Sequence, residues 1–284
     1  MRLRPATPVL AALVALLILP LGGPARAQPA RQLVERPGVT REVFAEGRGP
    51  LVILLPSLGR GAEDFADLAR RLAAAGFTAA RPEPRGIGGS RGPLQGLTLR
   101  DFAADAAAVI EAFGAGPAVV VGHAFGNRVA RMLASDRPEL VRAVVLLAAG
   151  GKAPMDPSIR DSLTKSFDLG LPEAERLEHV RRAFFAPGRD PAVWRGGWHR
   201  AVALAQAAAT QATPLEAWWA GGRAPILVVQ PMADTIAPPV NAKMLQEDIG
   251  PRVTVVEIPG AGHALLPEQP EALATAVIDY IRAR

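Results

Sequence analysis

The clearest sign of chemistry in this chain is a short turn that ends a buried apolar run. It reads Gly122-His123-Ala124-Phe125-Gly126. This is the form of the G-x-S-x-G turn that presents a serine nucleophile between a strand and a helix, with alanine in the place of serine. The pattern therefore predicts a reactive site from which the attacking hydroxyl group is missing.

Alternating strands and helices are predicted to position this turn. Short apolar runs indicate strands, and segments with helical spacing indicate helices between them. One helix is predicted over 98–113, with Thr98 as N-cap and Asp101 three residues on. The other predicted elements are strands at 51–55, 77–81, 118–121, 144–148, 226–230 and 253–258, and helices at 64–75, after the turn to 135, 240–249 and 270–283. This order predicts an α/β fold, with a mostly parallel sheet and helices on both faces.

Three segments depart from the alternation. Residues 28–39 are mostly polar and contain proline, which predicts a loose or extended arm, and residues 40–45 alternate weakly, which predicts an edge strand. Residues 151–222 contain helical stretches and all four tryptophans. They predict a helical cap over the carboxyl ends of the strands, where such sheets bind ligands. The core would then comprise residues 28–150 and 223–284.

Four segments, taken together, resemble the α/β-hydrolase superfamily in its capped, esterase- and lipase-like branch. The turn around Ala124 is the first. The segment 83–90, EPRGIGGS, is similar to the family's D-x-R-G-x-G-x-S loop, with glutamate where aspartate is usual. Segments 230–239, QPMADTIAPP, and 260–268, GAGHALLPE, look like the family's acid and histidine loops and follow in its chain order. The resemblance extends over nearly all of the sequence after residue 27 and implies the α/β-hydrolase fold.

The resemblance implies roles for two further side chains. In this family a serine attacks a carbonyl carbon, a histidine takes the serine's proton, and an acid orients the histidine. Carried onto this sequence, His263 would be the base and Asp234 the acid. Asp156 is an alternative acid, because a few members of the family place the acid after an earlier strand. His123 is expected to pack within the turn rather than to react.

An oxyanion hole would need two backbone N–H donors. By the resemblance, one belongs to Phe125 and the other to the loop 56–61, where Leu58 is the candidate. The family usually has His-Gly there, whereas this chain has proline and Ser57. Ser57 would face the same cleft and is a possible replacement nucleophile, although most serines in such loops bond the backbone.

Ala124 has no atom to attack with and no proton for His263 to remove, which excludes acyl-enzyme chemistry at this position. Three explanations are open. A serine was replaced deliberately, which the retained leader and the absence of a tag argue against. Alternatively, His263 and Asp234 act as a general base on water or on substrate, or the chain binds a small molecule without converting it. The expected substrate or ligand is a small or medium-sized apolar ester or carbonyl compound.

Residues 1–27 have the three parts of a secretory signal peptide. Arginines stand at positions 2 and 4, an apolar run covers 9–19, and a small-x-small site ends at Ala27. The run is too short for a membrane anchor, because spanning a bilayer takes about 20 residues. The sequence therefore predicts cleavage after Ala27 and export to the periplasm or beyond, with no integral membrane segment in the remaining chain.

Composition argues against several other partners. The net charge of +5 would fall to +2 if the three arginines of the leader were removed, and the other arginines are scattered among acids. No nucleic-acid partner is therefore expected. The chain has no cysteine, its four histidines lack ligand spacing with carboxylates, and it has no phosphate-binding glycine loop. Neither a metal nor a cofactor is expected.

Overall fold

The computed structural model describes residues 28–284, and the predicted signal peptide lies outside them. These residues form an eight-stranded sheet with the order β1-β2-β4-β3-β5-β6-β7-β8. The β1–β2 and β2–β4 pairs are antiparallel, and every other neighbouring pair is parallel. The strands are β1 Ala30–Arg36, β2 Val39–Gly47, β3 Leu51–Leu55, β4 Thr78–Pro82, β5 Ala118–His123, β6 Val141–Leu147, β7 Ile226–Pro231 and β8 Val253–Ile258.

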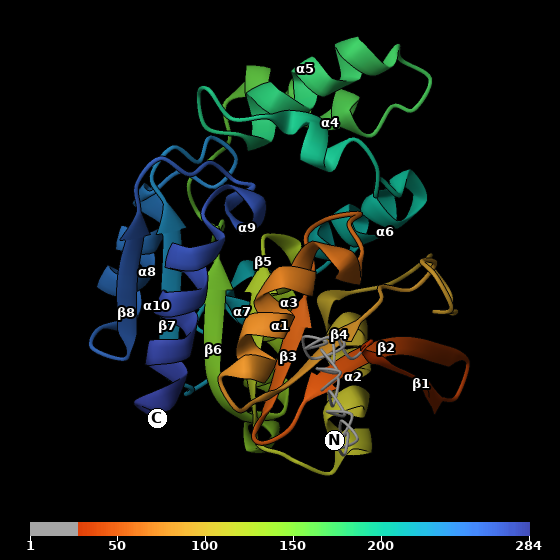
Figure 1. Ribbon diagram of the computed structural model, residues 1–284, viewed down its shortest axis with the longest axis vertical. Coiled ribbons are helices and arrows are strands. Elements are labelled where there is room, and N and C mark those ends of the chain that lie inside the picture. The colour runs from red at the N-terminus through yellow and green to blue at the C-terminus, as the bar shows by residue number, and fades with distance from the viewer. Residues whose placement is uncertain (1–27) are drawn as a thin grey trace, which may run out of the picture.

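Helices cover both faces of the sheet (Figure 1). One face packs against α2, α3 and α8, and the other against α1, α9 and α10. The central strand β3, with the sequence LVILL, is buried along its whole length because its alternate side chains enter these two separate cores. The helices of the two layers are α1 Ala66–Ala74, α2 Leu99–Phe113, α3 Phe125–Asp136, α8 Val240–Ile249, α9 Leu265–Glu268 and α10 Pro270–Arg282.

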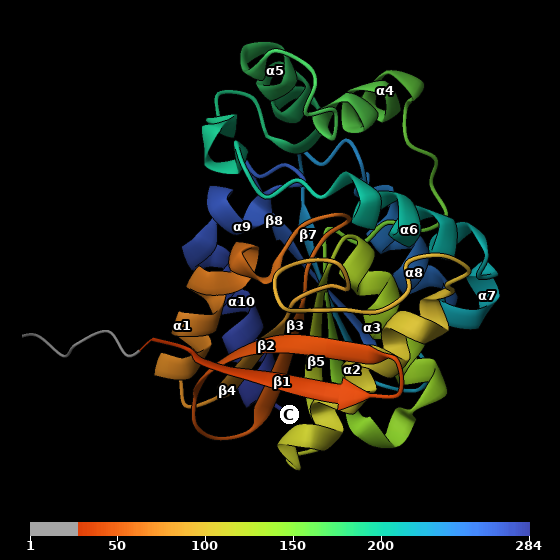
Figure 2. The same ribbon diagram turned by 90° about the vertical axis from the view of Figure 1, so that its right-hand side faces the viewer.

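Between β6 and β7 the chain forms a run of helices: α4 Pro157–Ser166, α5 Glu173–Phe184, α6 Arg200–Gln211 and α7 Leu215–Trp218. Figures 1 and 2 show α4 and α5 above the carboxyl ends of the central strands. Trp194 and Trp198 are buried there with Phe184, and their edge-to-face contacts form a small aromatic core. Trp218 and Trp219 instead join the main core beside α3.

The mostly parallel sheet with helices on both faces confirms the fold class predicted from the sequence. The helix Val240–Ile249 and the strand Val253–Ile258 have the predicted bounds. The start of α2 is a capping box in which Thr98 and Asp101 exchange hydrogen bonds. None of the helices within residues 28–284 is long and apolar enough to cross a bilayer.

The N-terminal residues are extended, as one of the two predictions for them had it, but they are part of the sheet rather than a separate arm, and the predicted edge strand is not at the edge. Residues of β1 pair with β2 as an antiparallel hairpin, and β2 lies between β1 and β4 rather than at the edge of the sheet. Of the seven residues in β1, only Val34 is buried. The segment therefore lacks the alternation that marks a half-buried strand, because this edge of the sheet has almost no core to face.

Candidate active site

The turn after β5 has a backbone conformation that only a glycine-flanked bend allows. Ala124 has φ 49° and ψ −104°, and its N–H donates to the carbonyl of Leu147 at 3.0 Å. A Cβ atom on Gly126 would lie 2.1 Å from the carbonyl oxygen of Leu55, and one on Gly122 would lie 2.2 Å from that of Gly126. Both glycines are therefore required for α3 to approach the sheet this closely.

His263 and Asp234 come together from two loops that follow neighbouring strands. The Nδ1 atom of His263 lies 2.9 Å from Oδ2 of Asp234, and both side chains are buried. The other carboxylate oxygen accepts the N–H groups of Ile236 at 2.9 Å and Ala237 at 2.8 Å. These bonds fix the carboxylate, so that it can orient the imidazole.

This contact also determines the tautomer of a neutral His263. A carboxylate can only accept hydrogen bonds, so Nδ1 carries the proton. Nε2 is then the basic nitrogen, and it has no hydrogen-bond partner within residues 28–284. An imidazole in this state can take a proton from a molecule bound beside it.

His123 makes a hydrogen bond to the backbone of the loop that carries His263. Its Nε2 donates to the backbone carbonyl of His263 at 2.8 Å, and the ring is fully buried. Burial, with a further contribution from His263, lowers the pKa of His123 to about 3. His123 is therefore neutral at physiological pH, and it packs and positions rather than transfers protons.

The two candidate oxyanion donors lie beside the turn. Within the described chain, neither the N–H of Leu58 nor that of Phe125 has an acceptor. The loop that carries Leu58 is tied to the cap, because the N–H of Gly59 donates to Oε1 of Gln206 at 2.7 Å and the N–H of His199 donates to the carbonyl of Gly59 at 3.0 Å. A helix of the cap thus holds the loop that would bind an oxyanion.

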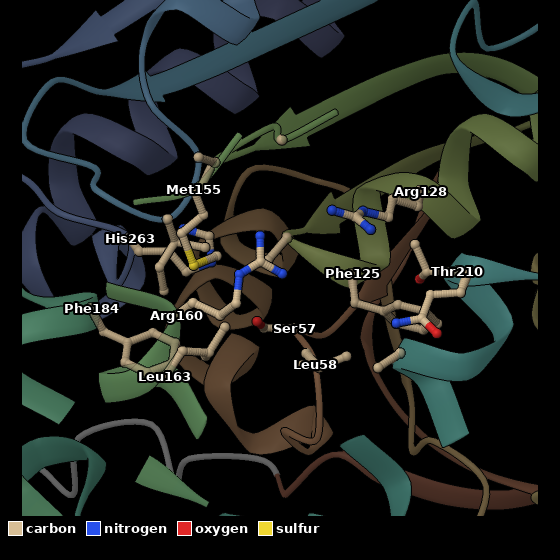
Figure 3. Close-up of a pocket in the computed structure, with 17 residues that line it drawn as sticks. Ser57, Leu58, Phe125, Arg128, Met155, Arg160, Leu163, Phe184, Thr210 and His263 are labelled. Carbon is tan, nitrogen blue, oxygen red and sulfur yellow. The ribbon is translucent and has the colours of Figure 1, made fainter. Parts of the chain in front are cut away.

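These groups surround a cavity of about 330 Å³, shown in Figure 3. Ala124 and His263 line the same cavity, so the sequence-predicted turn and base are brought together. Most of the remaining wall is apolar, which suits a small organic ligand. The lining residues are Ser57, Leu58, Ala124, Phe125, Arg128, Ala148, Gly150, Met155, Arg160, Leu163, Phe184, Ala207, Thr210, Gln211, Ile236, Ala237 and His263.

The structure places the other two predicted site residues differently. Ser57 is buried and lines the cavity. Asp156 does not contact His263: it is exposed and caps α4 by accepting the N–H of Ser158 at 2.8 Å. Asp234 therefore occupies the position of the acid, and Asp156 is corrected to a helix cap. No group of three or more potential metal-ligating side chains occurs within residues 28–284.

Three polar residues of this region escaped the sequence analysis. Arg128 and Arg160 line the cavity, and Gln206 holds the oxyanion loop. The position of Arg128, four residues after Ala124, places it on the cavity side of α3 and was a usable signal. Arg160 and Gln206 belong to the cap, and their places depend on tertiary packing that no local pattern shows.

A family model described as the alpha/beta hydrolase family matches residues 52–276, and the chain belongs to that family. Among curated proteins, it is 28% identical over 265 residues to a 2-(acetamidomethylene)succinate hydrolase of Mesorhizobium japonicum, covering 86% of this chain and 92% of that protein. It is also 30% identical over 271 residues to the polyketide synthase ThaQ of Burkholderia thailandensis, covering 88% of this chain.

The second likeness concerns a small part of a much longer protein, because the chain spans 13% of the length of ThaQ. Among solved structures, the enol-lactonase from Burkholderia xenovorans is similar, with a TM-score of 0.73 and 21% identity. That likeness covers 86% of this chain and 97% of the lactonase, and it is a likeness of fold. The matched family and the hydrolase from Mesorhizobium japonicum indicate a small molecule as the class of substrate.

Proposed function

We propose that this protein is a hydrolase in which His263 and Asp234 activate a water molecule against a small or medium-sized carbonyl compound. The observation that carries the proposal is the buried His263–Asp234 pair, whose imidazole lines the same cavity as Ala124. The methyl group of Ala124 leaves room for water where other members of the family carry a hydroxyl group.

The reaction needs no covalent intermediate. Nε2 of His263 takes a proton from water as the water oxygen bonds to the carbonyl carbon, and the electron pair of the C=O bond moves to its oxygen. The N–H groups of Leu58 and Phe125 stabilise that oxyanion. When the carbonyl reforms, the bond to the alkoxide breaks, and the imidazolium returns the proton to the leaving oxygen. For an ester, the products are an acid and an alcohol. General-base catalysis by His263 would raise the rate by about 10²–10⁴-fold.

A panel of short acyl esters and lactones tests this proposal. The wild type is expected to hydrolyse at least one of them, and His263→Ala is expected to remove that activity. His179→Ala is the matched control, since that imidazole lies in α5 near Ser162 and outside the cavity. Turnover that persists in His263→Ala would refute the proposal.

A binding protein is the second candidate, and the methyl side chain of Ala124 is the observation that favours it. In that case the same compounds would raise the thermal unfolding temperature of the protein without forming product. No hydrolysis above buffer for any compound, together with such stabilisation, would replace the hydrolase by a binding protein.

A third version assigns the attack to Ser57, which is buried beside the cavity. A fluorophosphonate would then label the wild type, and Ser57→Ala would abolish the label. An unlabelled wild type would exclude this version and leave water as the nucleophile.

A further inference from the structure

Two arginine side chains point into a cavity whose walls are otherwise mostly apolar. Arg128 comes from α3 and Arg160 from the cap helix α4. Figure 3 shows both guanidinium groups directed into the space between Phe125 and His263. Within residues 28–284, no carboxylate oxygen lies within 4.0 Å of either group, although both belong to the wall of the candidate active site.

Arg128 differs from the buried arginines of the described chain in having no hydrogen-bond partner for its side chain. Arg131 and Arg176 also lack a carboxylate, but they donate to Oδ1 of Asn127 and to the carbonyl of Arg195. Arg85 and Arg41 share the carboxylate of Asp105, and Arg60 pairs with Asp64. Arg128 is partly buried beside Trp218, whose ring lies 5.6 Å from its guanidinium carbon, and has no side-chain hydrogen bond within the described chain. Burial lowers the pKa of Arg128, and no neighbouring carboxylate opposes that effect. A charge kept in an apolar wall without an internal partner is costly unless a ligand completes it.

The position of Arg128 sets a distance along the cavity. It lies four residues after Ala124 on α3, which corresponds to about 6 Å along a helix axis. Because Arg128 and Ala124 line one cavity of about 330 Å³, a group bound to Arg128 would lie a few bonds from a carbonyl carbon placed beside Ala124. Arg160 approaches from the cap, so that the two guanidinium groups enclose this part of the cavity from different elements.

We propose that the cavity recognises a carbonyl compound that carries a carboxylate a few bonds from its reacting carbon, with the carboxylate held by Arg128 and Arg160. The planar guanidinium of Arg128 suits a bidentate contact, and Arg160, which is exposed, adds a second contact from the cap. This inference rests on the proposed function only for the carbonyl group that reacts. The carboxylate site itself does not depend on hydrolysis. The apolar wall accommodates the carbon skeleton between the two ends.

Binding by calorimetry tests the carboxylate site without relying on turnover. The probes are hexanoate and hexanamide, which have the same carbon chain and differ in charge. The wild type is expected to bind hexanoate more tightly by about 10-fold or more, the range expected for a hydrogen bond to a charged group. Equal affinity for the two probes in the wild type would overturn the proposal.

Single substitutions test which arginines cause the preference for hexanoate over hexanamide. Arg128→Gln is expected to remove most of it and Arg160→Gln part of it. Arg223→Gln is the matched control, because it removes the same charge from an exposed arginine outside the cavity and should leave the preference unchanged. Arg128→Lys keeps the charge but loses the fork, so it should weaken the preference less than Arg128→Gln and covers the case in which the glutamine variant does not fold. A full preference in both cavity variants would overturn the proposal.

The two proposals can fail separately. A hexanoate preference that depends on Arg128, with no hydrolysis by the wild type or by Ala124→Ser, would support the carboxylate site and refute the hydrolase. Hydrolysis of neutral esters with no hexanoate preference would support the hydrolase and overturn the carboxylate site.

Discussion

At the scale of single residues, Ala124 has a strained backbone conformation, although a methyl side chain gains nothing from it. Its φ of 49° and ψ of −104° lie outside the region that alanine prefers, and only one other non-glycine residue in the described chain has a positive φ. Such strain costs about 1–3 kcal/mol and usually persists at functional sites. The turn therefore has the geometry of a nucleophile-presenting bend, with the methyl group of Ala124 at its apex.

Replacing Ala124 with glycine should release this strain. Relief of the strain should raise the free energy of unfolding of Ala124→Gly, and the added entropy of the unfolded chain should offset part of that gain. We therefore expect a net rise of about 1 kcal/mol. Urea unfolding measures the change. Ala208→Gly, at an exposed interior position of α6, is the control and should lower the free energy of unfolding by about 1 kcal/mol. A similar loss in both variants would show that the turn is not strained.

At the scale of elements, a buried charge network ties the N-terminal hairpin to the core. Asp105 in α2 accepts hydrogen bonds from Arg36 of β1, Arg41 of β2 and Arg85 of the loop after β4. Burial alone would raise the pKa of Asp105, but the hydrogen bonds and charges of these arginines outweigh burial and lower it. The segment around Arg85 that resembles the family's loop thus has a structural role here.

Removing the charge of Asp105 should destabilise the fold. We expect Asp105→Asn to lower the free energy of unfolding by about 3 kcal/mol or more at neutral pH, since three guanidinium groups lose their partner. The exposed pair of Glu139 with Arg137 is the control, and Glu139→Gln should lower the free energy of unfolding far less than Asp105→Asn. Equal losses in the two variants would contradict a stabilising network.

Comparing the wild type with Asp105→Asn also tests how stability depends on pH. The pKa of Asp105 is lower in the folded state than in the unfolded chain, so its stabilisation is present above the unfolded value of about 3.9 and is lost as pH falls through the folded value. The difference in unfolding free energy between wild type and Asp105→Asn should therefore narrow below about pH 4. A difference that stays constant down to pH 2 would contradict the assigned shift.

The cap acts on the site through Gln206, which is buried and accepts the N–H of Gly59. We classify it as a positioning residue for the oxyanion loop. In an Ala124→Ser background, Gln206→Ala should lower kcat for a short ester by about 10-fold with little change in KM, because oxyanion contacts strengthen in the transition state. A raised KM with unchanged kcat would point instead to a role in binding substrate.

At the scale of the whole molecule, the parallel half of the fold could be predicted from the sequence because it is buried on both faces. Runs such as Leu51–Leu55 are continuously apolar, and they end at turns with clear glycine signals. The hairpin of β1 and β2 could not be predicted from the sequence, because β1 buries only Val34. Its pairing depends on the neighbouring strands and on the arginines that reach Asp105.

The candidate site was predictable to a similar extent. Ala124, Asp234 and His263 lie in loops with recognisable patterns, and the structure brings the last two into contact. Arg128 and Arg160 carry no local signature, because arginine accounts for most of the 32 basic residues of the chain. Only the packing of the cap on the core distinguishes these two from the rest.

Export remains a prediction about the whole chain. We propose that residues 1–27 are removed and that the protein acts outside the cytoplasm, on the basis of the three-part pattern of the leader. The intact mass of protein recovered from the periplasm or the medium should correspond to a chain beginning at Gln28. An uncleaved chain that stays inside the cell would contradict this proposal.

The central claim is that the cavity is a complete hydrolase site apart from its nucleophile, and adding a hydroxyl group at the turn tests it most directly. The measurement is the rate of p-nitrophenyl butyrate hydrolysis by Ala124→Ser, compared with wild type and with the same variant carrying His263→Ala. We expect Ala124→Ser to exceed the wild type by about 10²-fold or more, and the added His263→Ala to remove the gain. A folded Ala124→Ser protein that is no faster than wild type would contradict the claim.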